Sequence, residues 1–228
     1  MRQIVMDTET TGLDPAQGHR IVEIGCVEII DRKLTGNTFH VYINPERTMD
    51  EEVIAVHGIT NEFVADKPLF AAVAQGFLDF VRGSEMIAHN ATFDANFLNH
   101  ELKKMNPKLG KVEDYCTVVD SLALARKKHP GQKNNLDALC KRYYIDNSAR
   151  TFHGALLDSE ILAEVYLAMT GGQTALSLAG NGEDGLDSDG SVIRRLSADR
   201  PPLRVLRASD DELAQHREKL EKIGQELW

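Results

Sequence analysis

The pattern of apolar and polar positions up to Thr170 predicts strands first and helices afterwards. Short runs rich in apolar and β-branched residues predict five strands, at Gln3–Met6, Ile21–Ile30, Phe39–Ile43, Met86–Ala88 and Thr117–Val119. Only short turns separate the first three strands, including one at Thr35-Gly36-Asn37. This succession is typical of an antiparallel meander.

Helical periodicity takes over in the second half of this region. Apolar residues recur every three or four positions in four segments, Pro68–Val81, Asp94–Met105, Leu136–Tyr143 and Ala155–Met169. The last segment has the strongest apolar stripe, and Gly171-Gly172 ends it. A meander followed by alternating helices and strands predicts an α/β fold, with a mixed five-stranded sheet flanked by helices.

The pattern changes again beyond this domain. Residues 179–191 (AGNGEDGLDSDGS) are rich in Gly, Asp and Ser and predict a flexible acidic linker. Apolar and basic residues return in 192–228, where Ser209 and Glu212 form a capping box and Gly224 is placed to end the helix. A segment of about 40 residues cannot build its own core, so we expect it to order on a partner. The predicted organisation is therefore a domain over 1–178, a linker over 179–191 and a partner-binding tail over 192–228.

Composition narrows the possible partners. The formal net charge of −9 argues against broad electrostatic capture of nucleic acid, so any phosphate contact must be local, bridged by cations or maintained by a partner. The sequence shows neither a membrane span nor a signal peptide. Cys26, Cys116 and Cys140 form no C-x-x-C pair, which favours reduced, buried cysteines in a cytoplasmic protein.

Two acids stand directly behind the first apolar run, in VMDTETTGLD at residues 5–14. Side chains two apart share one face of a strand, so Asp7 and Glu9 are expected to lie together on the face of Val5. Two carboxylates this close repel each other, and burying either without a partner costs several kcal/mol. A divalent cation between them would resolve the repulsion. The alternative is a solvated loop after a short strand.

Two further stretches carry candidate chemistry. Asp94 stands in HNATFDANF at a predicted helix start, where capping alone would favour an acid. Asp158 lies in HGALLDSE, in the first turns of the strongest helix, and His153 precedes that helix. A histidine at such a junction is also compatible with a purely structural role.

Together these motifs resemble the DEDD exonuclease superfamily, histidine subtype. D-x-E on the first strand, N-x-x-F-D at a helix start and H-x-x-x-x-D near the last helix have the order and spacing of that superfamily. The stretches VHGIT, NNLDALC and HGALLDSEILAEVYLAMTGGQT, and the tail LRVLRASDDELAQHREKLEK, are similar to the proofreading exonucleases of bacterial replicative polymerases. The resemblance covers almost the entire chain and implies a ribonuclease H-like fold.

The resemblance implies a role for each residue of the motifs. Asp7, Glu9, Asp94 and Asp158 would hold two divalent cations, Mg²⁺ or Mn²⁺, whose preference for carboxylate oxygens fits this set. His153 would accept a proton from the attacking water as general base. The expected reaction is 3′–5′ hydrolysis of the terminal phosphodiester of a single-stranded DNA end, with release of 5′-mononucleotides.

Substrate contacts are also carried over from the resemblance. The terminal nucleotide is expected to contact seven residues, Asp7, Glu9, Thr10, Glu52, His57, Phe93 and Asp158. For Glu52 and His57 an ordinary pair at a helix end is the alternative. The stretch QTALSL at 173–178 resembles a sliding-clamp docking motif, in which Gln173, Leu176 and Leu178 would bind a groove on the clamp.

The tail decides between the functional hypotheses. A proofreading exonuclease needs a linker and a segment that binds the polymerase subunit, both of which this chain has. A stand-alone RNA-trimming exonuclease would share the catalytic residues but end soon after the last catalytic helix. A non-catalytic assembly module is the third hypothesis, and the presence of all four acids and the histidine argues against it. A small theta-like subunit is left open by the sequence.

Overall fold

The computed structural model describes residues 1–148, 150, 152–171 and 208–223. The chain divides into two compact units, Met1–Thr174 and Ala175–Trp228, and each is described by itself. The predicted clamp motif, the acidic linker and the residues at both ends of the tail lie outside the described residues.

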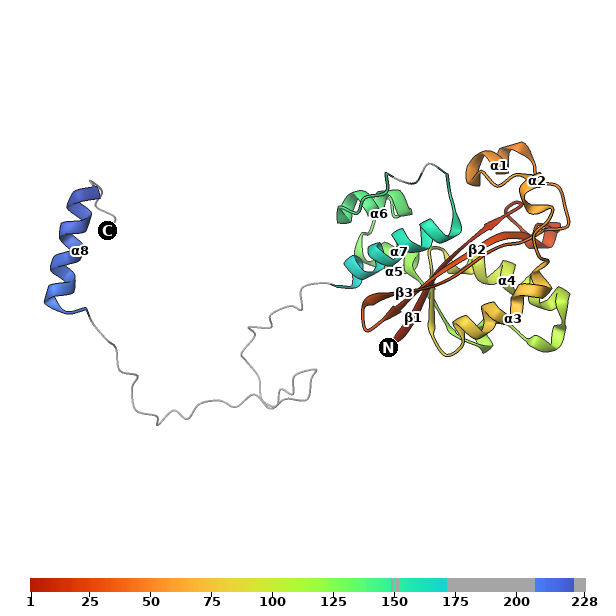
Figure 1. Cartoon of the computed structure of the whole chain (residues 1–228), viewed down its shortest axis with the longest axis horizontal. Helices are drawn as coiled ribbons and strands as arrows, with labels where there is room; N and C mark the ends of the chain where they lie inside the picture. The colour runs from red at the N-terminus through yellow and green to blue at the C-terminus, as the bar shows by residue number, and fades with distance from the viewer. Residues whose placement is uncertain (149, 151, 172–207, 224–228) are drawn as a thin grey trace. The chain divides into compact units, whose positions relative to one another are not determined.

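The first unit is built on a mixed sheet with the strand order β3-β2-β1-β4-β5 (Figure 1). β1 pairs antiparallel with β2, and β2 pairs antiparallel with β3, whereas β4 and β5 continue the sheet in parallel from β1. The strands are β1 (Arg2–Thr10), β2 (Ile21–Ile30), β3 (Lys33–Tyr42), β4 (Glu85–Ala88) and β5 (Thr117–Asp120). The predicted meander and mixed five-stranded sheet are confirmed.

The turn predicted at Thr35-Gly36-Asn37 is wrong. The chain reverses at Asp31-Arg32, whose φ angles of 49° and 64° are both positive, and β3 begins at once afterwards. The register between β2 and β3 shifts opposite Thr35-Gly36-Asn37, where the Thr35 hydroxyl donates a hydrogen bond of 2.9 Å to Glu28. The polar and glycine residues therefore mark a bulge within a strand.

Helices cover the sheet on both faces and include all four that the sequence predicts. The described helices of this unit are α1 (Glu51–His57), α2 (Asn61–Val64), α3 (Phe70–Val81), α4 (Ala91–Met105), α5 (Ser121–Lys128), α6 (Leu136–Tyr143) and α7 (Ala155–Thr170). Short 3-10 turns lie at Pro15–Gln17, Pro107–Leu109 and Val112–Asp114. Sequence periodicity missed α1, α2 and α5, which span one or two turns each.

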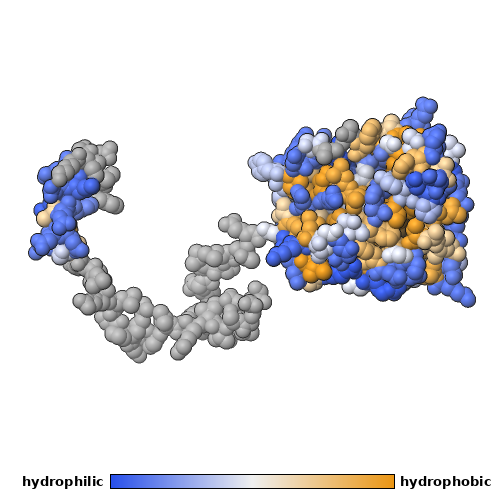
Figure 2. All heavy atoms as spheres, viewed as in Figure 1, coloured by the Kyte–Doolittle hydropathy of each residue, from blue (hydrophilic) through white to orange (hydrophobic). Residues whose placement is uncertain are grey.

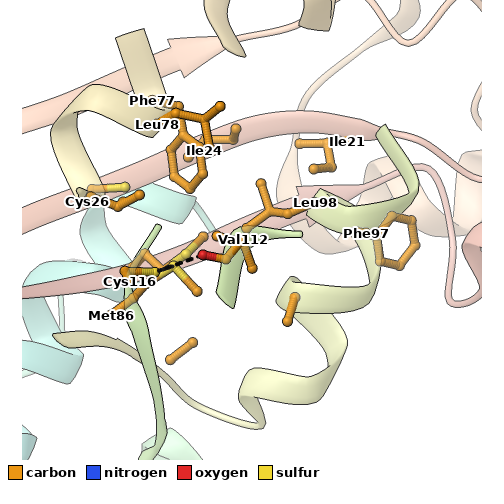
Figure 3. Close-up of a cluster of buried hydrophobic side chains, with 14 of the residues drawn as sticks. Ile21, Ile24, Cys26, Phe77, Leu78, Met86, Phe97, Leu98, Val112 and Cys116 are labelled. Carbon is orange, nitrogen blue, oxygen red and sulfur yellow. Dashed lines mark hydrogen bonds between the residues drawn. The ribbon is translucent and has the colours of Figure 1, made fainter. Parts of the chain in front are cut away.

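Alternating side chains of β1 pack into two separate hydrophobic clusters, one on each face of the sheet. Ile4 and Met6 of β1 pack in a cluster with residues of α3 and α4, part of which Figure 3 shows. Val5, between them, faces the opposite cluster, which contains residues of α6 and α7. Asp7 and Glu9 continue the alternation of Val5, so the carboxyl end of β1 carries both acids toward the face that α7 covers.

α7 lies unusually close to the sheet at Gly25, which pairs with Asp7 across β1 and β2. A side chain at Gly25 would collide with the backbone of Ala155 and Leu156. The Ser159 hydroxyl donates to the Gly25 carbonyl at 2.9 Å, and the Ala155 N–H donates to the Glu23 carboxylate at 3.0 Å. The first turns of α7 are thereby fixed beside the acidic end of β1.

The described part of the second unit is α8 (Asp210–Ile223). The predicted capping box is present, because Ser209 N–H donates to the Glu212 carboxylate at 2.8 Å and Glu212 N–H donates to the Ser209 hydroxyl at 3.3 Å. Figure 2 shows mostly hydrophilic residues on α8. In the described segments, every helix is too short or too polar to cross a membrane.

Candidate active site

A pocket of about 280 Å³ opens where β1 ends beside α7. It brings together Asp7, Glu9, His153 and Asp158, which the sequence had placed in two separate motifs. The pocket is further lined by Thr8, His89, Asn135, Leu136, Asp137 and Arg150. Strand β1, helices α6 and α7 and the loop before α7 thus each contribute residues to one concave site.

The fourth predicted acid, Asp94, reaches the same region from α4. Its side chain is 2% exposed and accepts a hydrogen bond of 2.7 Å from the Thr8 hydroxyl. Thr8 belongs to β1 but points to the opposite face from Asp7, so one strand end holds acids from both sides of the sheet.

The carboxylates of the site lack sufficient compensating positive charge. Burial, followed by repulsion from Asp94 and Glu9, raises the pKa of Asp7 well above its usual value. Burial, with a contribution from Asp158, raises the pKa of Glu9 to about 8. Burial also raises the pKa of Asp94 to about 7, although the hydrogen bond from Thr8 acts in the opposite direction. A cation in this site would relieve the repulsion directly.

The donor set fits a hard divalent cation. Glu9, His153 and Asp158 each offer one ligand atom, and these atoms all lie within 4.8 Å of one another. Carboxylate oxygens are the preferred ligands of Mg²⁺ and Mn²⁺. Asp7 lines the same pocket and adds a further carboxylate.

His153 sits at the mouth of the site and remains half exposed, with 50% of its side chain accessible. Its backbone N–H donates to the Val56 carbonyl at 3.1 Å, which ties the loop before α7 to α1. Its Nδ1 lies 3.7 Å from an Asp158 oxygen. The ring is therefore accessible to solvent and next to the acids, as a proton acceptor for water must be.

The predicted substrate residues differ in how the structure places them. His57 is 5% exposed, its Nδ1 accepts the Ile59 N–H at 3.0 Å, and its buried Nε2 has no hydrogen-bond partner among the described residues. Burial lowers the pKa of His57, although the Thr10 backbone acts in the opposite direction. His57 is not among the described residues that line the pocket, so its contact with the terminal nucleotide stays a prediction.

The remaining substrate candidates, Thr10, Phe93 and Glu52, are not among the described residues that line the pocket. Thr10 is buried and its hydroxyl donates to the Gly12 carbonyl at 2.6 Å. The Phe93 ring packs against Phe97 with centroids 4.9 Å apart. Glu52 is exposed in the first turn of α1.

Sequence reasoning missed several residues that line the pocket, among them Thr8, His89, Asp137 and Arg150. Strand alternation signalled that Thr8 faces away from Asp7, but nothing in the sequence indicated that α4 would meet it there. Arg150 stands in an irregular loop, where no periodicity indicates which way a side chain points. Its contacts with Asp158 join this loop to the first turns of α7, eight residues further along the chain.

Acids gathered from both faces of a mixed sheet, with a histidine at their edge, define the class of metal-dependent exonucleases. The profile of the exonuclease family matches residues 4–166. The chain is 52% identical to DNA polymerase III subunit epsilon of Salmonella typhimurium and 51% identical to that of Escherichia coli K12, in each case over 100% of this chain and 97% of the relative. The chain belongs to the epsilon subunit family of DNA polymerase III, the proofreading 3′–5′ exonucleases of that enzyme.

A solved structure agrees with this placement. Exonuclease X, in complex with 5′ overhanging duplex DNA, superposes with a TM-score of 0.57 at 30% sequence identity. The similarity covers 75% of this chain and 93% of that one. It therefore concerns the first unit and the sheet that carries the pocket.

Proposed function

We propose that the pocket at the end of β1 hydrolyses the 3′-terminal phosphodiester of single-stranded DNA and releases 5′-mononucleotides. Asp7, Glu9, Asp94 and Asp158 would hold two divalent cations, Mg²⁺ or Mn²⁺. When bound, such ions activate water and stabilise the leaving oxygen of an in-line displacement. The observation that carries this proposal is the gathering of buried, mutually repelling carboxylates in one pocket.

The protein's own residues would divide the remaining work. The ring of His153, half exposed beside Asp158, would take the proton of the attacking water. The hydrogen bond from Thr8 would fix the carboxylate of Asp94. By the resemblance to the family, His57 would hold the terminal nucleotide together with Thr10, Glu52 and Phe93.

The tail and the motif after α7 would bring the site to its substrate. Residues 192–228 are proposed to bind the alpha (polymerase) subunit of DNA polymerase III, and α8 offers Leu213, 43% exposed, to such a partner.

Gln173, Leu176 and Leu178 are proposed to dock on the sliding clamp. Surface plasmon resonance with a Gln173→Ala, Leu176→Ala double variant tests the docking, and unchanged clamp affinity would exclude it. The proposed place of action is the bacterial cytoplasm, at the replication fork, and a theta-like subunit is a further proposed partner.

The catalytic assignment is tested by a matched pair of substitutions on α7. Asp158→Asn removes a proposed ligand, whereas Glu160→Gln changes an exposed acid on the same helix. We expect Asp158→Asn to abolish Mg²⁺-dependent release of mononucleotides from a 3′-labelled single strand while the circular dichroism spectrum stays unchanged. Glu160→Gln should retain activity. Hydrolysis near the wild-type rate by Asp158→Asn would defeat the assignment.

A further inference from the structure

Arg150 is the one Lys or Arg side chain among the described residues that line the acidic pocket. It comes from the loop before α7, and only 10% of its side chain is exposed. Its Nε and Nη2 donate to the two carboxylate oxygens of Asp158 at 2.5 and 2.7 Å. This bidentate geometry is the strongest form of an arginine–carboxylate pair.

The same guanidinium also engages the proposed proton acceptor. Its Nη2 lies 3.0 Å from Nδ1 of His153. An arginine can only donate hydrogen bonds, so Nδ1 is the acceptor in this contact and a neutral ring carries its proton on Nε2. The lone pair with which His153 would take a proton is therefore directed at Arg150.

Arg150 and a divalent cation cannot both bind the carboxylate oxygens of Asp158 at the same time. The guanidinium covers both oxygens of a carboxylate that is 4% exposed, and a metal ion must reach at least one of them. Two positive charges sharing one carboxylate repel each other. A second carboxylate offers Arg150 an alternative position, because Nη1 already donates to Asp137 at 2.9 Å and the Asp137 side chain is 51% exposed.

We propose that Arg150 is a built-in counter-ion of the metal-free site. It neutralises Asp158 and occupies His153 while no metal is bound, and it leaves both when a divalent cation binds, keeping its contact with Asp137. The inference rests on the proposed function of the pocket as a metal site. It makes Arg150 a positioning residue that competes with the metal.

The direction in which the Mn²⁺ affinity changes on substitution of Arg150 tests this competition. In the full chain, Arg150→Met should bind Mn²⁺ at least about tenfold more tightly in calorimetry, because the metal no longer has to displace two charge-assisted hydrogen bonds. In EDTA the same variant should melt at a lower temperature, because Asp158 has lost its partner. If Arg150 merely supported the structure of the site, its removal would weaken Mn²⁺ binding.

Arg142→Met is the matched control. Arg142 lies on α6, the helix that contributes Leu136 and Asp137 to the pocket, and donates to the Asn134 side-chain oxygen at 3.1 Å and the Lys133 carbonyl at 2.9 Å. Its removal deletes one positive charge from a helix that lines the pocket but leaves the Arg150–Asp158 pair in place. We expect its Mn²⁺ affinity to stay within about twofold of wild type, so an equal tightening in both variants would reduce the effect to net charge.

The Arg150→Lys variant and the wild-type protein provide two further tests of the proposal. Arg150→Lys keeps the charge but loses the bidentate fork, so its Mn²⁺ affinity should lie between wild type and Arg150→Met, and an affinity below wild type would overturn the proposal. In the wild type, the Arg150 Nε–H resonance seen in EDTA should shift when Mg²⁺ is added, and an unmoved resonance at saturation would also overturn it. Failure of the wild type to bind any Mn²⁺ would instead refute the metal site itself.

Discussion

The acids of the site keep their carboxyl groups in surroundings that favour the protonated form. Burial raises the pKa of Glu9 to about 8 and that of Asp94 to about 7. Free carboxyl groups of an unfolded chain titrate near pH 4. Between about pH 4.5 and pH 8 Glu9 and Asp94 therefore bind more protons in the metal-free folded protein than in the unfolded chain, and their contribution to the free energy of unfolding falls as the pH rises.

This sign gives a prediction for the metal-free protein. Melting temperatures measured in EDTA from pH 5 to pH 8 should fall more steeply for the wild type than for Glu9→Gln, which lacks one of the titrating groups. Glu51→Gln, an exposed acid of α1, is the control and should follow the wild type. Parallel curves for the wild type and Glu9→Gln would show that Glu9 does not titrate abnormally.

His153 allows the acid–base role to be separated from metal binding. His153→Gln removes the proton acceptor but leaves the four carboxylates, so hydrolysis should fall by about 10²–10⁴-fold. Mn²⁺ binding measured by calorimetry should persist. Because a ring nitrogen of His153 lies within 4.8 Å of carboxylate oxygens of Glu9 and Asp158, loss of Mn²⁺ binding together with activity would identify it as a ligand instead.

Strand alternation was sufficient to predict the shared face of Asp7 and Glu9, because that property depends on the local backbone alone. Both acids line the same pocket, and Val5 packs in a cluster with residues of α7. The partners of these acids were not predictable in the same way. Thr8 meets Asp94 across 86 positions, which only the folded chain brings together, and Arg150 meets Asp158 from a loop without a periodic pattern.

At the scale of whole elements, the site depends on how closely α7 approaches β2. Gly25 permits this approach, because a Cβ there would collide with the backbone at the start of the helix. Gly25→Ala should lower the free energy of unfolding by about 1–3 kcal/mol through overpacking. It should also weaken Mn²⁺ binding, because α7 carries Asp158.

Gly76→Ala in α3 is the matched control for this prediction. A Cβ at Gly76 would only make an ordinary contact of 3.5 Å with Phe39, and alanine favours a helix over glycine. Urea unfolding should show Gly76→Ala to be as stable as the wild type or more so. Equal stability and equal Mn²⁺ affinity for Gly25→Ala would mean that the helix can shift without moving Asp158.

The elements with a clear apolar pattern were the ones that the sequence predicted well, as α6 and β2 show, where the predicted and observed bounds coincide. α1 was missed because its seven residues bury only His57, which leaves no apolar stripe. α5 begins on a side-chain cap, in which Asp120 accepts the N–H groups of Leu122 and Ala123 at 2.8 and 3.1 Å. A cap without an apolar stripe behind it is a weak signal.

At the scale of the whole molecule, the net negative charge explains why the exonuclease unit would need a tether to reach DNA. A chain with a net charge of −9 is repelled by the phosphate backbone and should meet DNA poorly by itself. Tethering to a polymerase replaces diffusion with an effective concentration on the order of mM. The hydrophobic core of the exonuclease unit is completed by residues of α7, without the described residues of the tail. α7 is capped at Gly171, whose N–H donates to the Leu167 carbonyl at 2.8 Å.

Truncation after Gly180 separates these two tasks. The shortened chain should hydrolyse single-stranded DNA at nearly the full rate, because every proposed catalytic residue precedes the cut. It should no longer co-elute with the polymerase subunit in size-exclusion chromatography, because residues 192–228 are the proposed anchor. A chain that lacks only residues 181–191 is the control and should co-elute as the full chain does. Co-elution of the truncated form as tight as that of the full chain would place the anchor in the first unit and leave the tail without its proposed role.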